Sequence, residues 1–455
     1  MNDPSRPISR RQWQLAERRF LLVVGDVLAV LLAVLIALVV WVMVDRRGLE
    51  IDFIVTRAYW FPVLAGLWLM IASANDFYHL RIASQLDTTL TRLVQITLQL
   101  LAIYGMFFFL SPRGVLPRLF ILYYGVLSFV LILIWRMLKP SGWVQARRVM
   151  IIGVGKGAAA IIDMLRHEAL HDYEIVGQLS EPGGDLPDRV RRESISEIIL
   201  AYEGELSRAG FQAVLDCYEQ GVNIISMPLL YEQIAGRVPV EYLTPQDWAA
   251  LLPAEGDAVF TPYSLVKRAM DVVLALLGLV SFTALLLVII PAQWLDSPGP
   301  IFFRQARVGR GGKVFRVIKL RSMIPDAERA SGPLWAAPDD PRITRVGRLL
   351  RRARLDEVPQ LINVLRGEMS LIGPRPERPE FVDQLSQTIP FYRARHAVRP
   401  GITGWAQVCY SYGSSPDDAQ MKLQYDLYYI RHRSLALDLL ILFRTAGKML
   451  ALRGR

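Results

Sequence analysis

Four apolar segments follow one another in the first third of the 455-residue chain, and they constrain its fold more than any other feature. A helix needs about 17 or more apolar residues to cross a bilayer, and each segment reaches or approaches that length. Hydrophobic residues also make up 53% of the sequence, a high share for a soluble protein. We therefore predict a membrane protein with an α-helical, four-helix transmembrane bundle over residues 1–140. The alternative is that the shorter segments are buried helices of a soluble domain. The segments are Phe20–Val44, Ala58–Ala74, Leu93–Leu110 and Leu119–Trp135.

The positive charges around these segments predict their orientation. If the N-terminus lies inside, the inner flanks and links hold most of the Lys and Arg, and the outer loops hold fewer. By the positive-inside rule, the N-terminus and the chain from residue 146 onward then lie in the cytosol. Asp26 occurs early in the first segment, where a carboxylate is expected near the interface or facing the other helices.

The middle region, residues 146–260, shows the alternation of strands and helices that predicts a Rossmann-like α/β domain with a parallel sheet. The stretch RRVMIIGVGKGAAAIIDML is typical of a strand, a glycine-rich turn and a helix. The turn contains Gly153, Gly155 and Gly157, an imperfect dinucleotide-binding fingerprint in which Glu181 would contact the ribose. We favour the alternative, a strand-to-helix joint that is empty or regulatory.

A fifth apolar segment, Val272–Trp294, has no charged residue over its 23 positions. Hydropathy alone indicates a fifth spanning helix, but four spans already return the chain to the cytosol. A fifth would export the Arg-rich region that follows, and that region carries residues suited to phosphate chemistry. We therefore predict a re-entrant membrane helix that enters and leaves by the same face, bent near Gly278 or Pro291. A plain spanning helix is the alternative.

The last region, residues 262–455, is predicted to be a mostly helical α+β domain rich in Arg and Lys. The net charge of the whole chain is +10, and guanidinium groups from separate segments can clamp a diphosphate. A basic face on anionic lipid is a second interpretation, and both can hold together. Nucleic acid is not an expected partner, because the basic residues are not paired with aromatic platforms. The candidate phosphate-binding residues are Lys319, Arg321, Arg351, Arg375 and Arg399.

Asp356 and Glu357 stand at the start of a predicted helix, DEVPQLINVLRGE. Pro359 fits the first turn, where backbone N–H groups lack partners. The dipole at a helix N-terminus favours ionised carboxylates and attracts phosphate. One carboxylate is then available to attack phosphorus or hold Mg2+, while the other handles a proton. From spacing alone, however, a helix cap beside a solvated acid is the more common arrangement.

Other side chains carry weaker signals. Asp339 and Asp340 are expected to form a turn or to cap the following helix. Cys217 and Cys409 lie far apart without nearby ligands, which argues against a disulfide framework or a zinc site. The five histidines are scattered and show no triad or metal-ligand pattern.

Five stretches of the C-terminal region, taken in order, resemble one family. They are YSLVKRAMDVVLALLGLV, PIFFRQARVGRGGKVFRVIKLRSM, RITRVGRLLRRARLDEVPQLINVLRGEMSLIGPRPE, RPGITGWAQV and KLQYDLYYIRHRSLALDLLILFRT. The region 262–455 is similar, over nearly its full length, to the bacterial sugar transferases, also called monotopic phosphoglycosyl transferases. With the four preceding helices and the Rossmann-like domain, the chain resembles the long form of that family, which initiates exopolysaccharide, capsule or O-antigen synthesis.

The resemblance implies a ping-pong reaction. Hexose-1-phosphate passes from a UDP-hexose to polyprenyl (undecaprenyl) phosphate, and UMP is released. Asp356 would attack the phosphorus that bears the sugar, form a phosphosugar-aspartate and contact Mg2+. Glu357 would deprotonate or orient the lipid phosphate. Arg351 and Arg375 match family positions near the phosphates, and Lys319 matches a basic position of the family.

Lys267, Arg268 and Asp271 match the amphipathic entry to the membrane helix of the family. One departure concerns the middle of that helix, where many members have Ser-Pro and this chain has Thr283-Ala284. The position of the bend is therefore open. The resemblance further implies the bacterial inner (cytoplasmic) membrane, a catalytic domain on its cytosolic face, and a homodimer as an option. UDP-glucose is slightly favoured as the donor, followed by UDP-galactose.

Two other functions agree with parts of the sequence. A membrane-anchored nucleotide-sugar oxidoreductase or dehydratase would work through the GVGKG turn, but it needs tight NAD binding and a catalytic Tyr-Lys pair that no clear motif supplies. A non-catalytic scaffold would use the basic C-terminal face. It would tolerate Asp356→Glu, whereas a nucleophile displaced by one methylene should fail.

Overall fold

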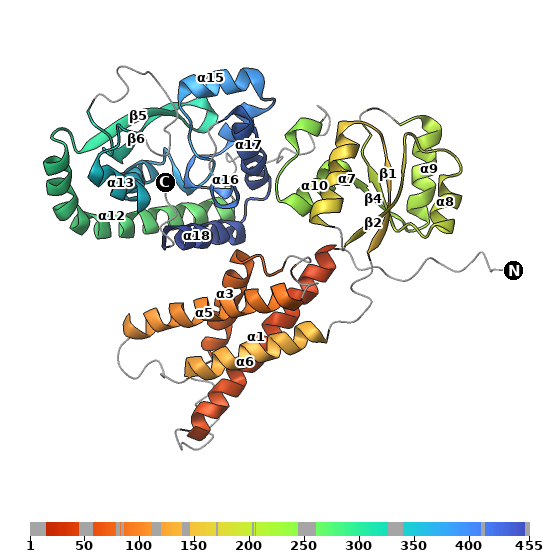
Figure 1. Ribbon diagram of the computed structural model, residues 1–455, viewed down its shortest axis with the longest axis horizontal. Coiled ribbons are helices and arrows are strands. Elements are labelled where there is room, and N and C mark those ends of the chain that lie inside the picture. The colour runs from red at the N-terminus through yellow and green to blue at the C-terminus, as the bar shows by residue number, and fades with distance from the viewer. Residues whose placement is uncertain are drawn as a thin grey trace. The chain divides into compact units, whose positions relative to one another are not determined.

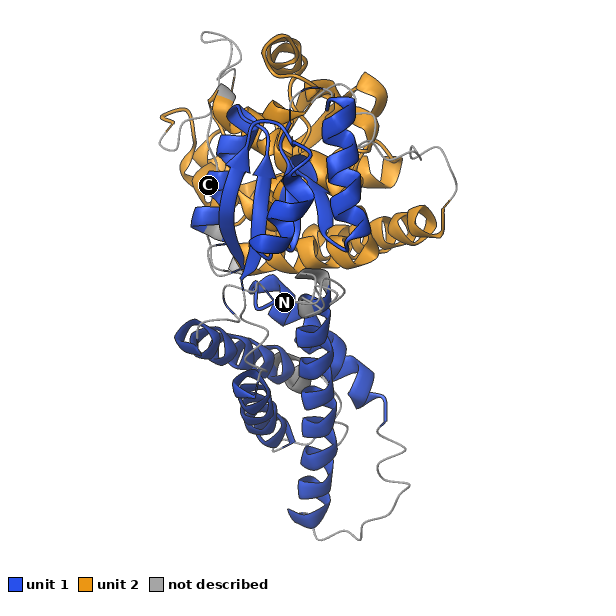
Figure 2. Cartoon of the chain, turned by 90° about the vertical axis from the view of Figure 1, so that its right-hand side faces the viewer, with its two compact units in different colours: residues 1–230 blue, residues 231–455 orange. Residues whose placement is uncertain are grey.

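The computed structural model describes residues 15–44, 58–78, 82, 86–110, 120–138, 146–169, 172–202, 204, 206–243, 261–325, 340–410 and 415–450. The chain divides into two compact units, Met1–Leu230 and Tyr231–Arg455 (Figure 2). The first unit contains the N-terminal helices and the α/β region. The second contains the basic C-terminal region together with residues 231–243, which the sequence had placed in the middle domain.

Each of the four N-terminal apolar segments forms a helix, as predicted. Helices α1 and α5 each pack against both α3 and α6, so the four helices form one cluster (Figure 1). By length and hydropathy, α1 and α6 qualify as membrane spans, and α3 is a shorter apolar helix. The helices are α1 (Leu15–Val44), α3 (Trp60–Ala74), α5 (Leu86–Leu110) and α6 (Phe120–Met137).

A buried ion pair lies inside this cluster. The Arg136 guanidinium donates to both carboxylate oxygens of Asp26, with Nε–Oδ1 and Nη2–Oδ2 distances of 3.2 and 2.6 Å. Both side chains are fully buried, and the guanidinium carbon lies 4.3 Å from the ring centre of Phe77. The prediction that Asp26 lies near the interface or faces the other helices is therefore confirmed in its second form.

The middle region folds into a four-stranded parallel sheet with strand order β2-β1-β3-β4, which confirms the predicted α/β architecture. Short helices connect the strands, and a buried apolar cluster fills the space between sheet and helices. The elements are β1 (Arg147–Ile152), α7 (Lys156–Glu168), β2 (Tyr173–Leu179), α8 (Leu186–Arg192), β3 (Glu197–Leu200), α9 (Arg208–Glu219) and β4 (Asn223–Ser226).

Backbone packing explains the glycine at the start of the GVGKG turn. Gly153 has a φ of 125°, and a Cβ there would lie 2.3 Å from the carbonyl oxygen of Ala201. A side chain at this position would therefore push β1 away from the end of β3. Glu181, the suggested ribose partner, is an exposed residue in a bend after β2.

The second unit combines helices with two small sheets, one antiparallel (β5-β6) and one parallel (β7-β8). In Figure 1, α18 lies beside the start of α12, where Lys267 contacts Asp438. The elements that begin before or within this unit are α10 (Met227–Ala235), η2 (Val240–Tyr242), α12 (Pro262–Asp296), β5 (Phe302–Val308), η3 (Arg310–Gly312), β6 (Val314–Leu320), α13 (Arg345–Arg352), η4 (Leu355–Gln360), α14 (Leu361–Arg366), β7 (Ser370–Ile372), α15 (Pro379–Thr388), η5 (Tyr392–Ala397), β8 (Gly401–Thr403), α16 (Trp405–Cys409), α17 (Pro416–Arg431) and α18 (Leu435–Leu450).

Helix α12 contains the fifth apolar segment and meets the length and hydropathy of a membrane span. It begins with a capping box between Thr261 and Ser264 and is assigned as one helix through Thr283, Ala284 and Pro291. Only one narrow face is buried against the unit. That face comprises Asp271, Ala275, Phe282, Ile289 and Gln293.

Asn363 fixes the position of α14 against β6. Its side chain is fully buried. The Oδ1 atom accepts from the backbone N–H of Ile318 at 3.1 Å, and Nδ2 donates to the carbonyl oxygen of Arg316 at 2.8 Å. The same amide nitrogen donates to Glu368. These bonds tie the helix that follows Asp356 to the strand that carries Lys319, so two distant segments meet at one place.

Candidate active site

Asp356 and Glu357 lie in a short 3-10 turn, η4, rather than at the start of the continuous α-helix that the sequence predicts. Pro359 lies inside this turn and has no N–H to donate. The α-helix α14 begins only at Leu361. Arg354, just before the turn, has a φ of 54°, a left-handed conformation that is uncommon for a residue with a side chain.

Glu357 is held by two cations. Lys319 Nζ lies 3.3 Å from Oε1, and the guanidinium of Arg375 contacts both carboxylate oxygens. Burial opposes ionisation of this carboxyl, but the positive charges of Arg375 and Lys319 outweigh it and hold the pKa of Glu357 well below its usual value. Glu357 is therefore an ionised carboxylate whose oxygens are already occupied.

Asp356 has a different environment, although it is the adjacent residue. It is 8% exposed, and none of the described residues donates a hydrogen bond to its carboxylate. Burial and the negative charge of Glu357 raise its pKa, and the charges of Lys319, Arg351 and Arg375 oppose that shift. A carboxylate without bound donors keeps its lone pairs available for an electrophile or a cation.

Arg351 approaches the same site from α13. Its Nε donates to Ser322 Oγ at 2.8 Å. Burial lowers the pKa of the guanidinium, and the charge of Asp356 acts against that shift. Gly347 sets the position of α13, because a Cβ there would lie 2.1 Å from the carbonyl oxygen of Ser322. Lys319, Arg351 and Arg375 thus come from three separate segments and place positive charge near the two carboxylates.

Two of the candidate phosphate-binding residues have other surroundings. Arg321 donates to the carbonyl oxygen of Pro300 at 2.7 Å and to Ser297 Oγ at 2.9 Å, so it secures the segment after α12. Arg399 lines a cavity beside the start of α12, and neither Asp356 nor Glu357 lines that cavity. The guanidinium of Arg321 donates its hydrogen bonds to backbone and hydroxyl acceptors. Spacing in the sequence cannot reveal such contacts.

The three residues that were matched to the membrane-helix entry attach the start of α12 to the unit. Lys267 Nζ lies 2.9 Å from Asp438 Oδ2. Arg268 donates to the carbonyl oxygens at the end of α14, at 2.7 and 2.9 Å. Asp271 accepts from Ser370 Oγ at 3.1 Å and from the N–H of Leu371 at 2.9 Å. Because α14 and β7 flank the site, these contacts couple the position of the apolar helix to that of Asp356.

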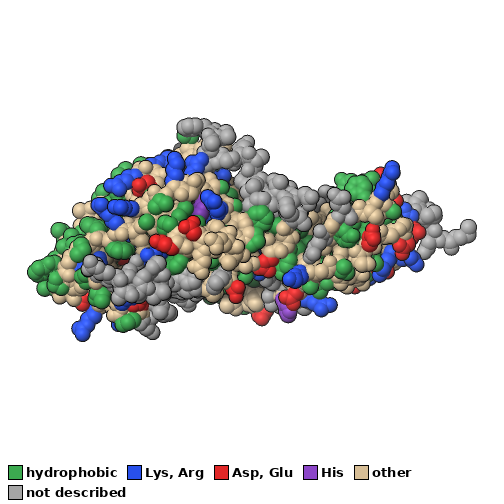
Figure 3. Space-filling model, turned by 90° about the horizontal axis from the view of Figure 1, so that it is seen from above, with side chains coloured by type: hydrophobic (Ala, Val, Ile, Leu, Met, Phe, Trp, Pro, Cys, Tyr) green, Lys and Arg blue, Asp and Glu red, His purple; other side chains and the backbone are tan. Residues whose placement is uncertain are grey.

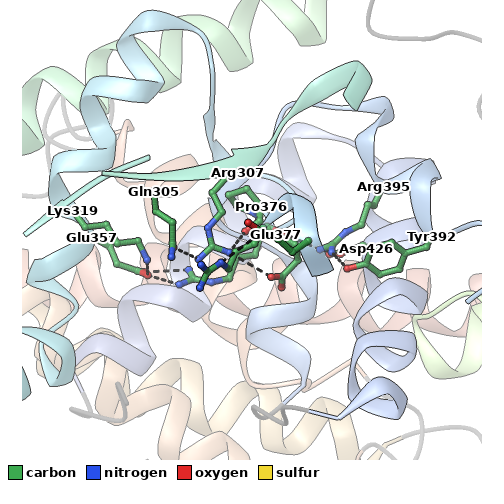
Figure 4. Close-up of polar contacts among 12 residues, drawn as sticks. Gln305, Arg307, Lys319, Glu357, Pro376, Glu377, Tyr392, Arg395 and Asp426 are labelled. Atoms are coloured by element: carbon green, nitrogen blue, oxygen red, sulfur yellow. Dashed lines mark hydrogen bonds and ion pairs between the residues drawn. The ribbon is translucent and has the colours of Figure 1, made fainter. Parts of the chain in front are cut away.

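A second row of polar residues supports Arg375 from behind, and the sequence analysis did not single it out. Arg395 Nη2 donates to the carbonyl oxygen of Arg375 at 2.9 Å and to Asp426 Oδ2 at 2.7 Å. Arg307 donates to the carbonyl oxygen of Pro376 at 3.1 Å. Figure 4 shows these contacts as a series that runs from Lys319 and Glu357 to Asp426 and Arg395. The only sequence signal was that Arg307 and Asp426 occur within the stretches that resemble the family.

Within the described parts of the chain, no group of three or more His, Cys, Asp or Glu side chains has the geometry of a metal site. Asp340 forms the predicted turn and pairs with Arg342, and Asp339 lies outside the described residues. Because Glu357 is occupied by cations, Asp356 is the carboxylate of the adjacent pair that retains coordinating oxygens. One carboxylate together with substrate phosphates is a usual ligand set for Mg2+.

These features define a class of protein. A buried carboxylate with open lone pairs lies beside cations that suit phosphate oxygens, in a unit that carries a long, exposed apolar helix. That combination fits a membrane-associated transferase that acts on phosphorylated substrates.

The family model described as bacterial sugar transferase matches residues 262–452, and one described as a CoA-binding domain matches residues 73–228. The chain belongs to the bacterial sugar transferase family. It is 47% identical to a UDP-glucose:undecaprenyl-phosphate glucose-1-phosphate transferase of Caulobacter vibrioides, over 41% of this chain and 70% of that protein. It is 29% identical to the protein of the same name from Escherichia coli, over 90% of this chain and 91% of the relative.

Other relatives match over shorter parts. The chain is 43% identical to a UDP-N-acetylgalactosamine-undecaprenyl-phosphate N-acetylgalactosaminephosphotransferase of Aeromonas hydrophila, over 51% of this chain and 54% of that protein. It is 36% identical to an undecaprenyl-phosphate glucose phosphotransferase of Komagataeibacter xylinus, over 66% of this chain and 58% of that one. The chain thus spans little more than half the length of these two relatives.

Proposed function

We propose that this protein transfers hexose-1-phosphate from a UDP-hexose to polyprenyl phosphate and releases UMP. The observation that carries the proposal is the contrast between the two adjacent carboxylates. Glu357 is ionised and held by Arg375 and Lys319, whereas Asp356 has no hydrogen-bond donor among the described residues and faces the same cations. The names of the relatives support the same general reaction.

In the first step, an Asp356 oxygen attacks the phosphorus that bears the sugar. A bond forms between that oxygen and phosphorus, the bond from phosphorus to the UMP oxygen breaks, and UMP leaves with the electron pair. Lys319, Arg351 and Arg375 stabilise the charge that develops on the phosphoryl oxygens. The product is a phosphosugar-aspartate. Asp356 must be ionised to attack, and the positive charges of Lys319, Arg351 and Arg375 favour that form against the effect of burial on its pKa.

In the second step, an oxygen of the lipid phosphate attacks the same phosphorus and the bond to Asp356 breaks. The carboxylate is regenerated and a polyprenyl-diphosphate sugar forms. Glu357 lies next to the reacting residue and accepts or orients a proton of the incoming lipid phosphate. Its carboxylate is already ionised beside Arg375 and Lys319, so no prior proton loss is needed, and its lowered pKa favours orienting that proton over removing it.

Mg2+ is the proposed cofactor, with Asp356 as its protein ligand. When bound, the ion supplies positive charge to the diphosphate. Removal of divalent cations with EDTA is expected to stop UMP release, and Mg2+ is expected to restore it. Undiminished release in EDTA would remove the metal from the proposal.

UDP-glucose is the donor that we propose first, because several relatives are named for glucose. UDP-galactose stays the second candidate, and UDP-N-acetylgalactosamine, named for the Aeromonas relative, is a further competitor. Incubation of purified membranes with each radiolabelled donor, followed by extraction of labelled lipid, tests the choice. The homodimer stays a prediction.

We propose that the protein is a multi-pass component of the bacterial cytoplasmic membrane, with the second unit on the cytosolic face and α12 re-entrant. Polar contacts support this arrangement, because both ends of α12 touch the same unit. Arg268 binds the end of α14 near its start, and Gln293 and Asp296 bind Arg321 and Val346 near its end. A plain spanning helix would separate these contacts by a bilayer. A topology reporter at Arg455 is expected to read as cytosolic, and a periplasmic signal would overturn this placement.

The mechanism is tested with Asp356→Asn in the full-length protein. This change removes the nucleophilic oxygen charge at constant size, so UMP release is expected to fall by about 10³-fold or more. Asp356→Glu is expected to fail similarly, because one methylene displaces the attacking atom. Asp163→Asn on the exposed face of α7 is the matched control. Normal turnover by either Asp356 variant would refute the nucleophile.

A further inference from the structure

A cavity of about 220 Å³ lies beside the first turns of α12, and its walls are strongly basic. The site residues Asp356, Glu357, Lys319, Arg351 and Arg375 do not line it. Its polar lining combines the start of α12 with residues from β7 and three loops, namely Tyr263, Lys267, Ser370, Arg310, Arg399 and Arg433.

Several side chains of this cavity wall already have hydrogen-bond or ion-pair partners within the protein. Lys267 is paired with Asp438 and also donates to Tyr429 at 3.1 Å. Arg268 donates to two backbone carbonyl oxygens, and Asp271 accepts two hydrogen bonds. These residues therefore build the floor of the cavity.

Three arginines from separate segments converge on the rim. Arg310 lies in the turn between β5 and β6, and Arg399 precedes β8. Arg433 follows α17 and lines the cavity, and its Nε donates to the carbonyl oxygen of Ile430 at 3.2 Å. Within the part of the chain that the structure describes, no hydrogen bond or ion pair holds the guanidinium of Arg399. Planar guanidinium groups bind anionic oxygens two at a time, so the rim favours an anion over a neutral ligand. A phosphate offers more acceptor oxygens than a carboxylate and so suits three converging arginines better.

The size of the cavity restricts what carries the phosphate. Sites for drug-sized ligands usually occupy about 300–1,000 Å³, so a whole nucleotide sugar exceeds this space. A phosphate group with a short polar attachment fits better. The remainder of the ligand must then extend out of the cavity, along the surface next to it.

The neighbouring surface is apolar. Leu265 lines the cavity and is 55% exposed, and Val266 beside it is also exposed. Further along the same helix, Val273, Leu277 and Val280 are more than half exposed. Burial of one such side chain stabilises by about 1.5–3 kcal/mol, so this face requires lipid cover. Figure 3 shows the unit from above the view of Figure 1, a face on which Lys and Arg side chains lie among hydrophobic ones.

We propose that this cavity binds the phosphate group of an anionic phospholipid through Arg310, Arg399 and Arg433, while the acyl chains lie along the exposed face of α12. The proposal rests on the membrane placement of the second unit, but it does not depend on the chemistry at Asp356. The bound lipid would fix the depth at which the catalytic unit meets the bilayer.

The test measures retained lipid on the purified full-length protein by native mass spectrometry. Protein in neutral detergent is titrated with phosphatidylglycerol, then in a second arm with polyprenyl phosphate, and in a third with inorganic phosphate as competitor. The variants are Arg399→Gln and the double variant Arg310→Gln with Arg433→Gln. Arg316→Gln, an exposed arginine on β6 outside the cavity, is the matched control.

Loss of charge-assisted hydrogen bonds is expected to weaken lipid retention about tenfold in both cavity variants and not in Arg316→Gln. Retention of phosphatidylglycerol supports the proposal, whereas retention of polyprenyl phosphate alone would overturn it, because the cavity would then hold the acceptor of the reaction. Equal retention by wild type and folded cavity variants would overturn the proposal, as would displacement by inorganic phosphate at the lipid's own concentration. Asp356→Asn should keep the lipid while it loses transfer, so a failure of the proposed reaction is distinguishable from a failure of this site.

Discussion

The N-terminal helices and the catalytic unit each bury carboxylates beside arginines, but they do so in opposite ways. In the helix cluster, Asp26 and Arg136 form a single bidentate pair with both side chains fully buried. In the catalytic unit, two adjacent carboxylates share cations from three segments. Glu357 takes the direct contacts, and Asp356 has none from the described residues.

This difference separates structural from chemical use of charge. In the helix cluster both oxygens of the buried carboxylate are bound by the guanidinium, so the pair serves to hold the helices together. A buried carboxylate without donors costs free energy and persists only where the surrounding fold fixes it. The first arrangement should therefore matter for stability and the second for reaction rate, and variants can test both halves of that statement.

The largest expected effect is on the second half-reaction, in Glu357→Gln. The amide keeps the shape but can no longer accept a proton, so transfer to the lipid is expected to fall by about 10²–10⁴-fold. Asp356 can still react, and a single UMP per enzyme should be released before turnover stops. Quenched-flow measurement of UMP and labelled lipid separates the two steps. Loss of both to the same extent would show that Glu357 acts before UMP leaves.

Arg136→Met should lower the stability of the protein and leave its reaction rate unchanged, the reverse of what is expected for Glu357→Gln. It leaves Asp26 buried without its partner, a change that typically costs about 3–5 kcal/mol. Transfer per folded molecule should stay normal. The double variant Asp26→Leu with Arg136→Met should recover most of the stability, because it removes both charges. Thermal unfolding in detergent with parallel UMP assays checks both. If fully folded Arg136→Met released UMP more slowly than the wild type, the Asp26–Arg136 pair would not be purely structural.

Asp426→Asn is expected to have a smaller effect on catalysis. Burial raises the pKa of Asp426 to about 6 despite the charge of Arg395, so the carboxylate contributes charge near neutral pH. The amide keeps an acceptor for Arg395, which still holds the backbone of Arg375. We expect a drop of about tenfold or less in kcat with KM for UDP-hexose affected less. A change in stability alone would mean that the Arg395–Asp426 pair does not position Arg375.

The smallest effect concerns pH. A nucleophile must be ionised, and burial together with the charge of Glu357 raises the pKa of Asp356. The rate of the first UMP release should therefore fall as the pH is lowered. The inflection of this pH–rate profile should lie above the ordinary pKa range of Asp. Glu357→Gln removes the neighbouring negative charge and should move this inflection to lower pH. Rapid-quench rates measured from acid to neutral pH test the direction. An inflection that moves upward, or stays in place, would contradict the assignment.

Much of the architecture follows from local patterns. Long apolar runs predicted the N-terminal helices, because a run of that length has few stable alternatives. Alternating buried strands and a glycine turn predicted the parallel sheet. The site was harder, since the sequence alone made Asp356 more typical of a helix cap. Only the resemblance of the segments around it indicated a nucleophile, and Arg395 escaped notice because its role appears only where it meets Arg375.

The sequence by itself determined the apolar helices, the order of domains and the presence of many cations in the C-terminal region. The tertiary structure decided which cation serves which purpose. Arg375 and Lys319 hold Glu357, Arg321 secures the segment after α12, and Arg399 faces a separate cavity. The physical reason is that hydropathy and periodicity are properties of neighbours in the chain, whereas an ion pair depends on atoms a few ångströms apart in space.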